Sequence, residues 1–99
     1  MRRGSTPTNV FLVDLDLTAA TVFVSYEQGG KVIIEKTGTD LTVTDEDITL
    51  TLTQEETLRF SPGEVLIQIR YVMPNGTADA SNIIRTTAER IIKDGVIEP

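Results

Sequence analysis

Hydrophobic and polar residues alternate along several short stretches of this chain, and an alternation with a period of two is the pattern of a half-buried β-strand. The longest such stretch is Glu64–Met73. Its hydrophobic side chains share one face: Val65, Ile67, Ile69, Tyr71 and Met73. Polar side chains occupy much of the opposite face: Glu64, Gln68 and Arg70. This pattern predicts a long strand that forms one wall of a hydrophobic core.

Shorter stretches with apolar positions predict further strands before it: Asn9–Val13, Ala20–Glu27, Lys31–Thr37, Leu41–Val43 and Ile48–Leu52. β-Branched residues and threonines are common in them, which favours strand over helix. Gly29-Gly30 separates the second stretch from the third and is typical of a tight hairpin. Asn75-Gly76 turns the chain back in the same way after the longest stretch.

One short segment has the signature of a helix start. Thr53 is followed three residues later by Glu56, a spacing at which the hydroxyl and the carboxylate each accept a hydrogen bond from the other residue's backbone amide. Pro62 disfavours helical geometry at the residue before it, so the helix cannot extend far. We therefore expect one short helical turn near residues 53–60.

The segment Ser81–Lys93 carries two competing signals. Ile84, Ala88, Ile91 and Ile92 would share one face of a helix, with Gly95 as a candidate C-cap. The β-branched residues of the segment and the Asn-Gly turn before it favour a strand instead, which would pair with Glu64–Met73 as the closing hairpin. The strand is the favoured interpretation, and the helix stays open as the alternative.

Together these elements indicate the architecture. Six to seven short strands separated by turns, with almost no helix, indicate an all-β fold in which two antiparallel sheets pack face to face. With 99 residues the chain is long enough for one core. The polar segment at the start contains Gly4 and Pro7. We expect residues 1–8 to form a flexible N-terminal arm and residues 9–99 a single β-sandwich domain.

Charge and the missing residue types exclude several kinds of site. The chain has no cysteine or histidine, so it can form neither disulfides nor thiolate zinc sites. A net charge of −6 argues against nucleic acid as a partner, because phosphate binding requires a basic surface. No apolar run is long enough to span a membrane, and the N-terminal residues lack the apolar core of a secretory signal. We expect no membrane partner and a protein used without export.

Two acidic motifs are candidates for chemistry. Asp14-Leu15-Asp16-Leu17-Thr18 has the form of the haloacid-dehalogenase nucleophile motif, but that mechanism needs a parallel sheet for which this chain is too short. Asp45-Glu46-Asp47, together with Asp40, could bind calcium through oxygen ligands, although the spacing of a calcium loop is absent. Solvated turns explain both motifs better. We predict no catalytic residue, no cofactor and no metal ligand.

Arginines and tyrosines are the remaining candidates for binding. Four arginines could face an acidic partner, but outward-facing sheet positions whose stems cover apolar surface explain them better: Arg59, Arg70, Arg85 and Arg90. Tyr26 and Tyr71 could stack on a sugar, which makes a carbohydrate-binding β-sandwich module the alternative function. Both lie in phase with apolar neighbours, so a core position with a satisfied hydroxyl is the favoured interpretation.

Four segments carry a resemblance to a known family: RRGSTPTNVF, LTQEETLRFSPGEVLIQIR, NGTADASN and RIIKDGVI. The chain resembles short proteins from the tail-gene regions of phages and prophages of Gram-positive bacteria. The match is most specific from Leu52 to Arg70 and covers nearly the whole chain. The order of strand, helical turn, glycine and strand is also similar to the immunoglobulin-like N-terminal domain of phage baseplate upper proteins.

The resemblance implies an immunoglobulin-like antiparallel β-sandwich that is a structural or assembly part of a tail or baseplate and not an enzyme. Its partners would be other phage tail or baseplate proteins and further copies of itself. It would lie in the bacterial cytoplasm during assembly and could remain in the virion. The polar closing segment suggests a sheet edge open to a partner, with three candidate contact residues: Arg85, Thr87 and Glu89.

Overall fold

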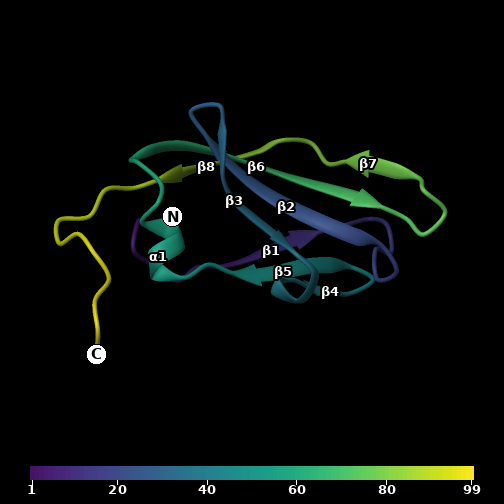
Figure 1. Ribbon diagram of the computed structural model, residues 1–99, viewed down its shortest axis with the longest axis horizontal. Helices are drawn as coiled ribbons and strands as arrows, with labels where there is room; N and C mark the ends of the chain where they lie inside the picture. The colour runs from purple at the N-terminus through teal and green to yellow at the C-terminus, as the bar shows by residue number, and fades with distance from the viewer.

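The computed structural model covers residues 1–99 and has two antiparallel sheets packed face to face (Figure 1). The strands are β1 Thr8–Leu12, β2 Thr21–Gln28, β3 Lys31–Thr37, β4 Thr42–Val43, β5 Asp47–Thr51, β6 Gly63–Val72, β7 Ala78–Ala80 and β8 Ile84–Ala88. Two short helical segments complete the fold: the 3₁₀ turn η1 Gly38–Asp40 and the helix α1 Gln54–Thr57. Neither is long enough to cross a membrane.

The strand order is that of an immunoglobulin-like sandwich. One sheet has the order β1-β5-β4, and the other has β3-β2-β6 with β7 and β8 both on the far side of β6. These positions correspond to strands B, E and D of an immunoglobulin domain and to strands C′, C, F and G. The predicted antiparallel β-sandwich is therefore confirmed, with eight strands where six to seven were expected. No strand occupies the position of strand A beside β1.

The core lies between the sheets and contains fifteen buried hydrophobic residues. The longest strand behaves as its alternation predicts, because Val65, Ile67 and Ile69 on β6 are all buried. Tyr71 is half-buried at the end of the strand. On the opposite sheet, β5 contributes alternate buried residues to the same core, among them Ile48.

The helical turn crosses from one sheet to the other after β5, and the predicted capping box is confirmed. The Glu56 amide donates to the Thr53 hydroxyl (3.1 Å), and the Thr53 amide donates to the Glu56 carboxylate (2.9 Å). The same carboxylate binds the ammonium of Lys36 from β3 at 2.6 Å, with both side chains largely buried. The turn is thus tied to the five-stranded sheet as well as to its own sequence neighbours.

The closing segment is a strand, as favoured, and the helix alternative for Ser81–Lys93 is wrong. The strand is shorter than the segment and is preceded by β7, which the sequence did not predict. Both strands pair with β6, and the break between them is held by Ser81. Its amide donates to the Ile69 carbonyl (2.8 Å), and its hydroxyl accepts from the Ile69 amide (3.0 Å). Pairing with β6 therefore outweighs the helical periodicity of the isolated segment.

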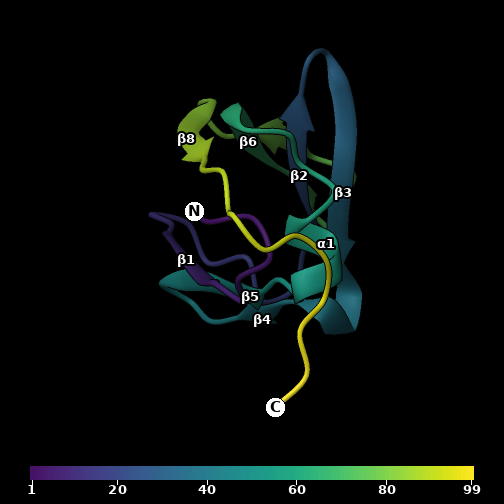
Figure 2. The same cartoon turned by 90° about the vertical axis from the view of Figure 1, so that its left-hand side faces the viewer.

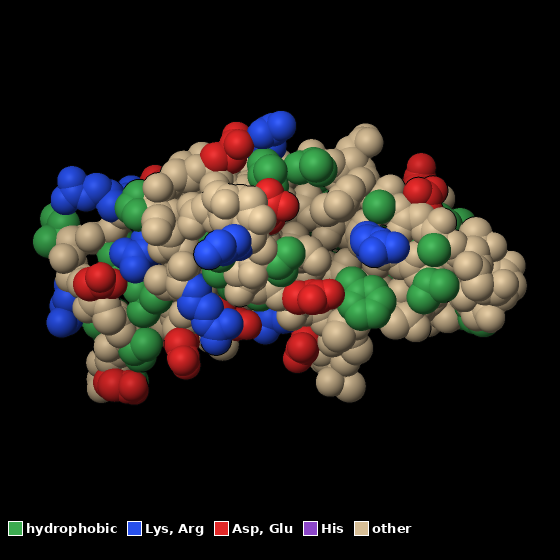
Figure 3. All heavy atoms as spheres, turned by 45° about the horizontal axis from the view of Figure 1, so that its top comes forward, with side chains coloured by type: hydrophobic (Ala, Val, Ile, Leu, Met, Phe, Trp, Pro, Cys, Tyr) green, Lys and Arg blue, Asp and Glu red, His purple; other side chains and the backbone are tan.

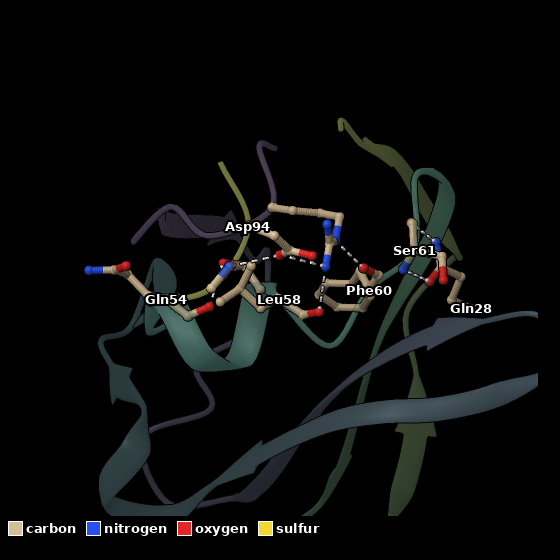
Figure 4. A network of polar contacts seen from close by, with 9 residues as sticks. Gln28, Gln54, Leu58, Phe60, Ser61 and Asp94 are labelled. Carbon is tan, nitrogen blue, oxygen red and sulfur yellow. Dashed lines mark hydrogen bonds and ion pairs between the residues drawn. The ribbon is translucent and has the colours of Figure 1, made fainter. Parts of the chain in front are cut away.

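The first residues have a defined place in the structure, whereas the sequence suggested a flexible arm over residues 1–8. They run beside the end of β8 and then past α1 (Figure 2). Arg3 is their main anchor: its guanidinium donates to the carbonyls of Leu58 and Phe60 just after α1. Figure 4 shows these carbonyls and the nearby carboxylate of Asp94. The arm contacts the domain through groups that the sequence alone does not bring together.

Candidate docking edge

The sandwich is open along one side. In Figure 2 the strands β1 and β8 lie one above the other on that side, each at the margin of its own sheet. β1 pairs with β5 alone, so its other edge faces solvent. An unpaired strand edge presents backbone donors and acceptors that a further strand can complete. This margin is the candidate site.

The register of β1 identifies which backbone groups are free. In an antiparallel pair, alternate residues direct their N–H and C=O groups toward the partner strand. The Val13 amide donates to the Glu46 carbonyl (2.8 Å), which places the odd-numbered residues of β1 toward β5. The N–H and C=O groups of Thr8, Val10 and Leu12 therefore point away from β5. These three alternate residues, each with one free N–H and one free C=O group, offer up to six hydrogen bonds to an added strand.

An apolar groove runs beside this edge, between β1 and the strands β7 and β8. Its larger part has a volume of about 530 Å³, and ten of its thirteen lining residues are hydrophobic. Leu12 at its rim is 84% exposed, and Val10 is 55% exposed. A second hollow of about 320 Å³ continues it toward the start of β1 and shares Val10, Phe11 and Ile84 with it. A strand added to β1 would lie along this groove and cover it.

The groove carries negative charge at one end. Asp14 and Asp79 line the part beyond the end of β1. At the other end Arg85 lines the hollow beside the start of β1, but its guanidinium is paired with Glu64. Because the acidic end is exposed, its charges act on a partner mainly by fixing its direction, not by adding much affinity.

Of the three predicted contact residues, Arg85 lies on β8 and points away from the core. Its guanidinium binds the Glu64 carboxylate of β6 at 2.9 Å, and both side chains are mostly exposed. This cross-strand pair belongs to the outer face of the five-stranded sheet. A surface pair of this kind contributes little to stability, so the Arg85 side chain can be released to a partner at low cost.

Thr87 and Glu89 are occupied by the chain itself. The N-terminal ammonium of Met1 donates to the Thr87 carbonyl (2.7 Å). Arg2 forms a parallel bridge with Glu89 and binds its carboxylate at 3.3 Å. The end of β8 is therefore completed by the N-terminal segment, and the open edge expected there lies mainly on β1.

The remaining sheet margins are less suited to docking. β4 has two residues, and β3 is charged along its length through Lys31, Glu35 and Lys36. Short and charged edges are the usual protection against unwanted strand pairing. On the face seen in Figure 3, charged side chains of both signs are interspersed and hydrophobic ones are scattered. The margin at β1 combines a neutral strand with an apolar groove.

The two acidic motifs lie in exposed turns. Thr18 donates to the Asp16 carboxylate from its amide (3.0 Å) and its hydroxyl (2.7 Å), and these hydrogen bonds lower the pKa of Asp16. Thr44 donates from its hydroxyl to the Asp47 carboxylate (2.8 Å), which closes the second turn locally. No group of three or more acidic side chains comes together in a way that could hold a metal ion.

Tyr26 lies in the core. Its side chain is fully buried and packs against Phe60, with 6.3 Å between the ring centroids. The side-chain amide of Asn9 donates to the Tyr26 hydroxyl (2.7 Å), as expected for a core tyrosine whose hydroxyl has a hydrogen-bond partner. Burial raises the pKa of Tyr26 to about 12. Its ring is not available to stack on a sugar, whereas Tyr71 lines the apolar groove.

Sequence reasoning placed the open edge on β8 and missed the one on β1. A signal for β1 was present: the run Val10-Phe11-Leu12-Val13 is apolar at four consecutive positions, so both faces of the strand are hydrophobic. A strand with one solvated face alternates instead. The apolar outer positions, Val10 and Leu12, are the ones that the structure leaves exposed.

Comparisons with known proteins add little to this picture. No family model matches the chain. No curated protein matches it either. Among solved structures, it is similar to the V domain of amphioxus IgVJ-C2, with 14% sequence identity and a TM-score of 0.39 over 92% of this chain and 97% of that one. The immunoglobulin-like assignment rests on the strand order described above.

Proposed function

We propose that this protein is a non-enzymatic structural or assembly module of a phage or prophage tail, and that it acts by accepting a strand at the open edge of β1. The phage context comes from the sequence resemblance of the chain. The observation that supports the mode of action is the unpaired edge of β1 beside an apolar groove of about 530 Å³.

Strand addition suits this margin physically. Backbone hydrogen bonds to Thr8, Val10 and Leu12 supply pairing that depends little on sequence, and the groove selects for apolar side chains at alternate positions of the partner. The groove lining is neutral except for Asp14 and Asp79 at one end, so a docking strand desolvates no charge along most of its length. An added strand would take the place of strand A, which the immunoglobulin-like order leaves open here.

Binding to neighbouring tail or baseplate proteins tests the proposal. Each neighbour is co-expressed with this chain, and complexes are separated by size-exclusion chromatography. Leu12→Lys places a charge on the free edge at a side chain that is 84% exposed, so it should abolish the complex without unfolding the domain. Val32→Lys is the matched control, because Val32 is also an exposed apolar residue but lies on β3.

Hydrogen exchange of the complex gives an independent readout. In the free chain the amides of Val10 and Leu12 should exchange fast, and in the complex they should be protected. Equal loss of binding in Leu12→Lys and Val32→Lys, or a complex in which β1 stays unprotected, would refute the proposed mode of action. A chain that binds none of its neighbours would refute the assembly role.

A further inference from the structure

Exposed hydrophobic side chains gather in two places on this molecule. Nine large hydrophobic residues are exposed. Four of them line the groove beside β1: Val10, Leu12, Leu15 and Ile84. Three more lie on the C-terminal segment Arg90–Glu98: Ile92 at 94%, Val96 at 53% and Ile97 at 54% exposure. Exposed apolar groups that gather in patches mark interaction sites, so we expect each of these two patches to be buried against a partner.

The C-terminal segment is held to its own domain by few contacts. The Gln54 side chain exchanges two hydrogen bonds with the backbone of Ile97, at 3.0 and 2.9 Å. The guanidinium of Arg2 donates to the Arg90 carbonyl (3.1 Å), and that of Arg3 lies 3.5 Å from the carboxylate of Asp94, which is itself 69% exposed. No residue after β8 lies in a strand or a helix. These contacts can be exchanged for pairing along a strand edge.

The order of charges in the segment matches the groove. The first half of the segment has a net positive charge from Arg90, Lys93 and Asp94, and Glu98 comes last. If the segment runs antiparallel to β1, its basic half lies at the acidic end of the groove, near Asp14 and Asp79. The parallel direction would instead bring Glu98 to that end, where like charges repel. The groove therefore favours the antiparallel direction for this occupant.

The segment of the same molecule cannot adopt that direction. β8 ends beside Gly63, at the end of the sandwich where β1 begins, and the segment then passes α1 (Figures 1 and 2). A chain entering its own groove from there would run parallel to β1. The occupant with the right direction must come from a second molecule.

We infer that Arg90–Glu98 of one copy adds antiparallel to β1 of the next, so that copies of this chain associate head to tail. This inference rests on the proposed function, because it names the strand that the docking edge accepts. A head-to-tail contact uses two different surfaces of each molecule, so it generates a ring if the rotation closes and a filament if it does not. Pairing of β1 with β1 of another copy would bury only two five-residue strands and leave the C-terminal segment uncovered.

Two variants separate the two halves of the contact. Val10→Pro removes an outward-facing amide of β1, so it should prevent a further strand from pairing with this edge. The hydrogen bonds from β1 to β5 stay in place, and proline is tolerated on edge strands of this kind. Ile92→Ser, Val96→Ser and Ile97→Ser together remove the apolar side chains of the donor segment, all of which are exposed in the free chain. Circular dichroism verifies that both variants remain folded.

Sedimentation velocity over a range of concentrations is the measurement. The unchanged chain should associate progressively, and each variant alone should stay monomeric. An equimolar mixture of the two should form a dimer and nothing larger, because one variant supplies an intact segment and the other an intact edge. A strictly monomeric unchanged chain would overturn the inference, and so would association of the triple serine variant to the same extent as the unchanged chain.

Reversing the charges of Lys93 and Asp14 provides a second test, which does not depend on whether Val10→Pro folds. Lys93→Glu should weaken self-association about tenfold, and Asp14→Lys in the same chain should restore it. Failure of the second change to restore association would refute the antiparallel placement. A chain that never self-associates, yet binds a neighbouring tail protein through β1, would overturn this inference and leave the proposed function standing.

Discussion

Replacing Arg3 with alanine tests whether the N-terminal segment is part of the fold. The Arg3 side chain is 16% exposed, and its guanidinium donates to the carbonyls of Leu58 and Phe60, the first at 3.0 Å. It also lies 3.5 Å from the carboxylate of Asp94. The sequence suggests a flexible arm here, for which the same change would have almost no effect.

The magnitude follows from these contacts. A hydrogen bond to a charged group contributes about 1.5–3 kcal/mol, and the loss is partly offset where water reaches the freed carbonyl. The ion pair to the exposed Asp94 adds less than about 1 kcal/mol. We expect Arg3→Ala to reduce the free energy of unfolding by about 2–4 kcal/mol, since two carbonyls lose a charged donor. In a domain of this size the melting temperature should fall by at least about 8 °C.

Chemical denaturation and thermal melting followed by circular dichroism measure both quantities. Arg2→Ala is the matched control, because Arg2 is the same residue type one position away but is 61% exposed and pairs at the surface with Glu89. It should cost less than about 1 kcal/mol. Arg3→Lys should fall between the two, because an ammonium cannot reproduce the fork of a guanidinium. Equal effects of Arg2→Ala and Arg3→Ala would refute the assignment of Arg3 as the anchor.

Four further predictions concern α1 and the core. Thr53→Ala should destabilise the domain by about 1 kcal/mol in urea denaturation through loss of the cap, and no loss would contradict the capping box. Burial alone would raise the pKa of Glu56, but hydrogen bonds from Lys36 and the Thr53 amide lower it overall. The ionised Glu56 should therefore stabilise the fold above the unfolded-state pKa near 4.5, and this contribution should disappear as the pH falls below that value. In Glu56→Gln the contribution should be absent at all pH values. Because the pKa of Tyr26 is raised to about 12, its contribution to the free energy of unfolding should decline as the pH rises above the unfolded-state pKa of 10.0. Tyrosinate absorbance should show one tyrosine that titrates at higher pH than the other, and Tyr26→Phe should remove that titration. Asn9→Ala should lower the melting temperature by leaving the Tyr26 hydroxyl without its donor, and an unchanged value would contradict that role.

Much of the fold is encoded in short segments that can be read locally. The alternation in β6 requires one face to be buried, whichever strands cover it. The capping box at Thr53 and the glycine pair at the β2–β3 turn each depend on residues within three or four positions of one another. Gly29 and Gly30 both have positive φ values, 61° and 80°, which glycine adopts without a steric penalty. Such features give the sandwich and its turns before any tertiary contact is known.

The docking edge and the anchoring of the N-terminus are decided by tertiary structure. Whether a strand lies at an edge depends on which distant strand pairs with it, and periodicity describes the faces of a strand but not its margins. β8 presents backbone groups like those of β1, but its end is completed by Arg2, a residue 87 positions earlier. Arg3 likewise finds its carbonyl partners 55 and 57 residues along the chain. The sequence by itself determined the faces and turns of this protein because those are short-range properties, and its free margin was decided by contacts that exist only once the chain has closed on itself.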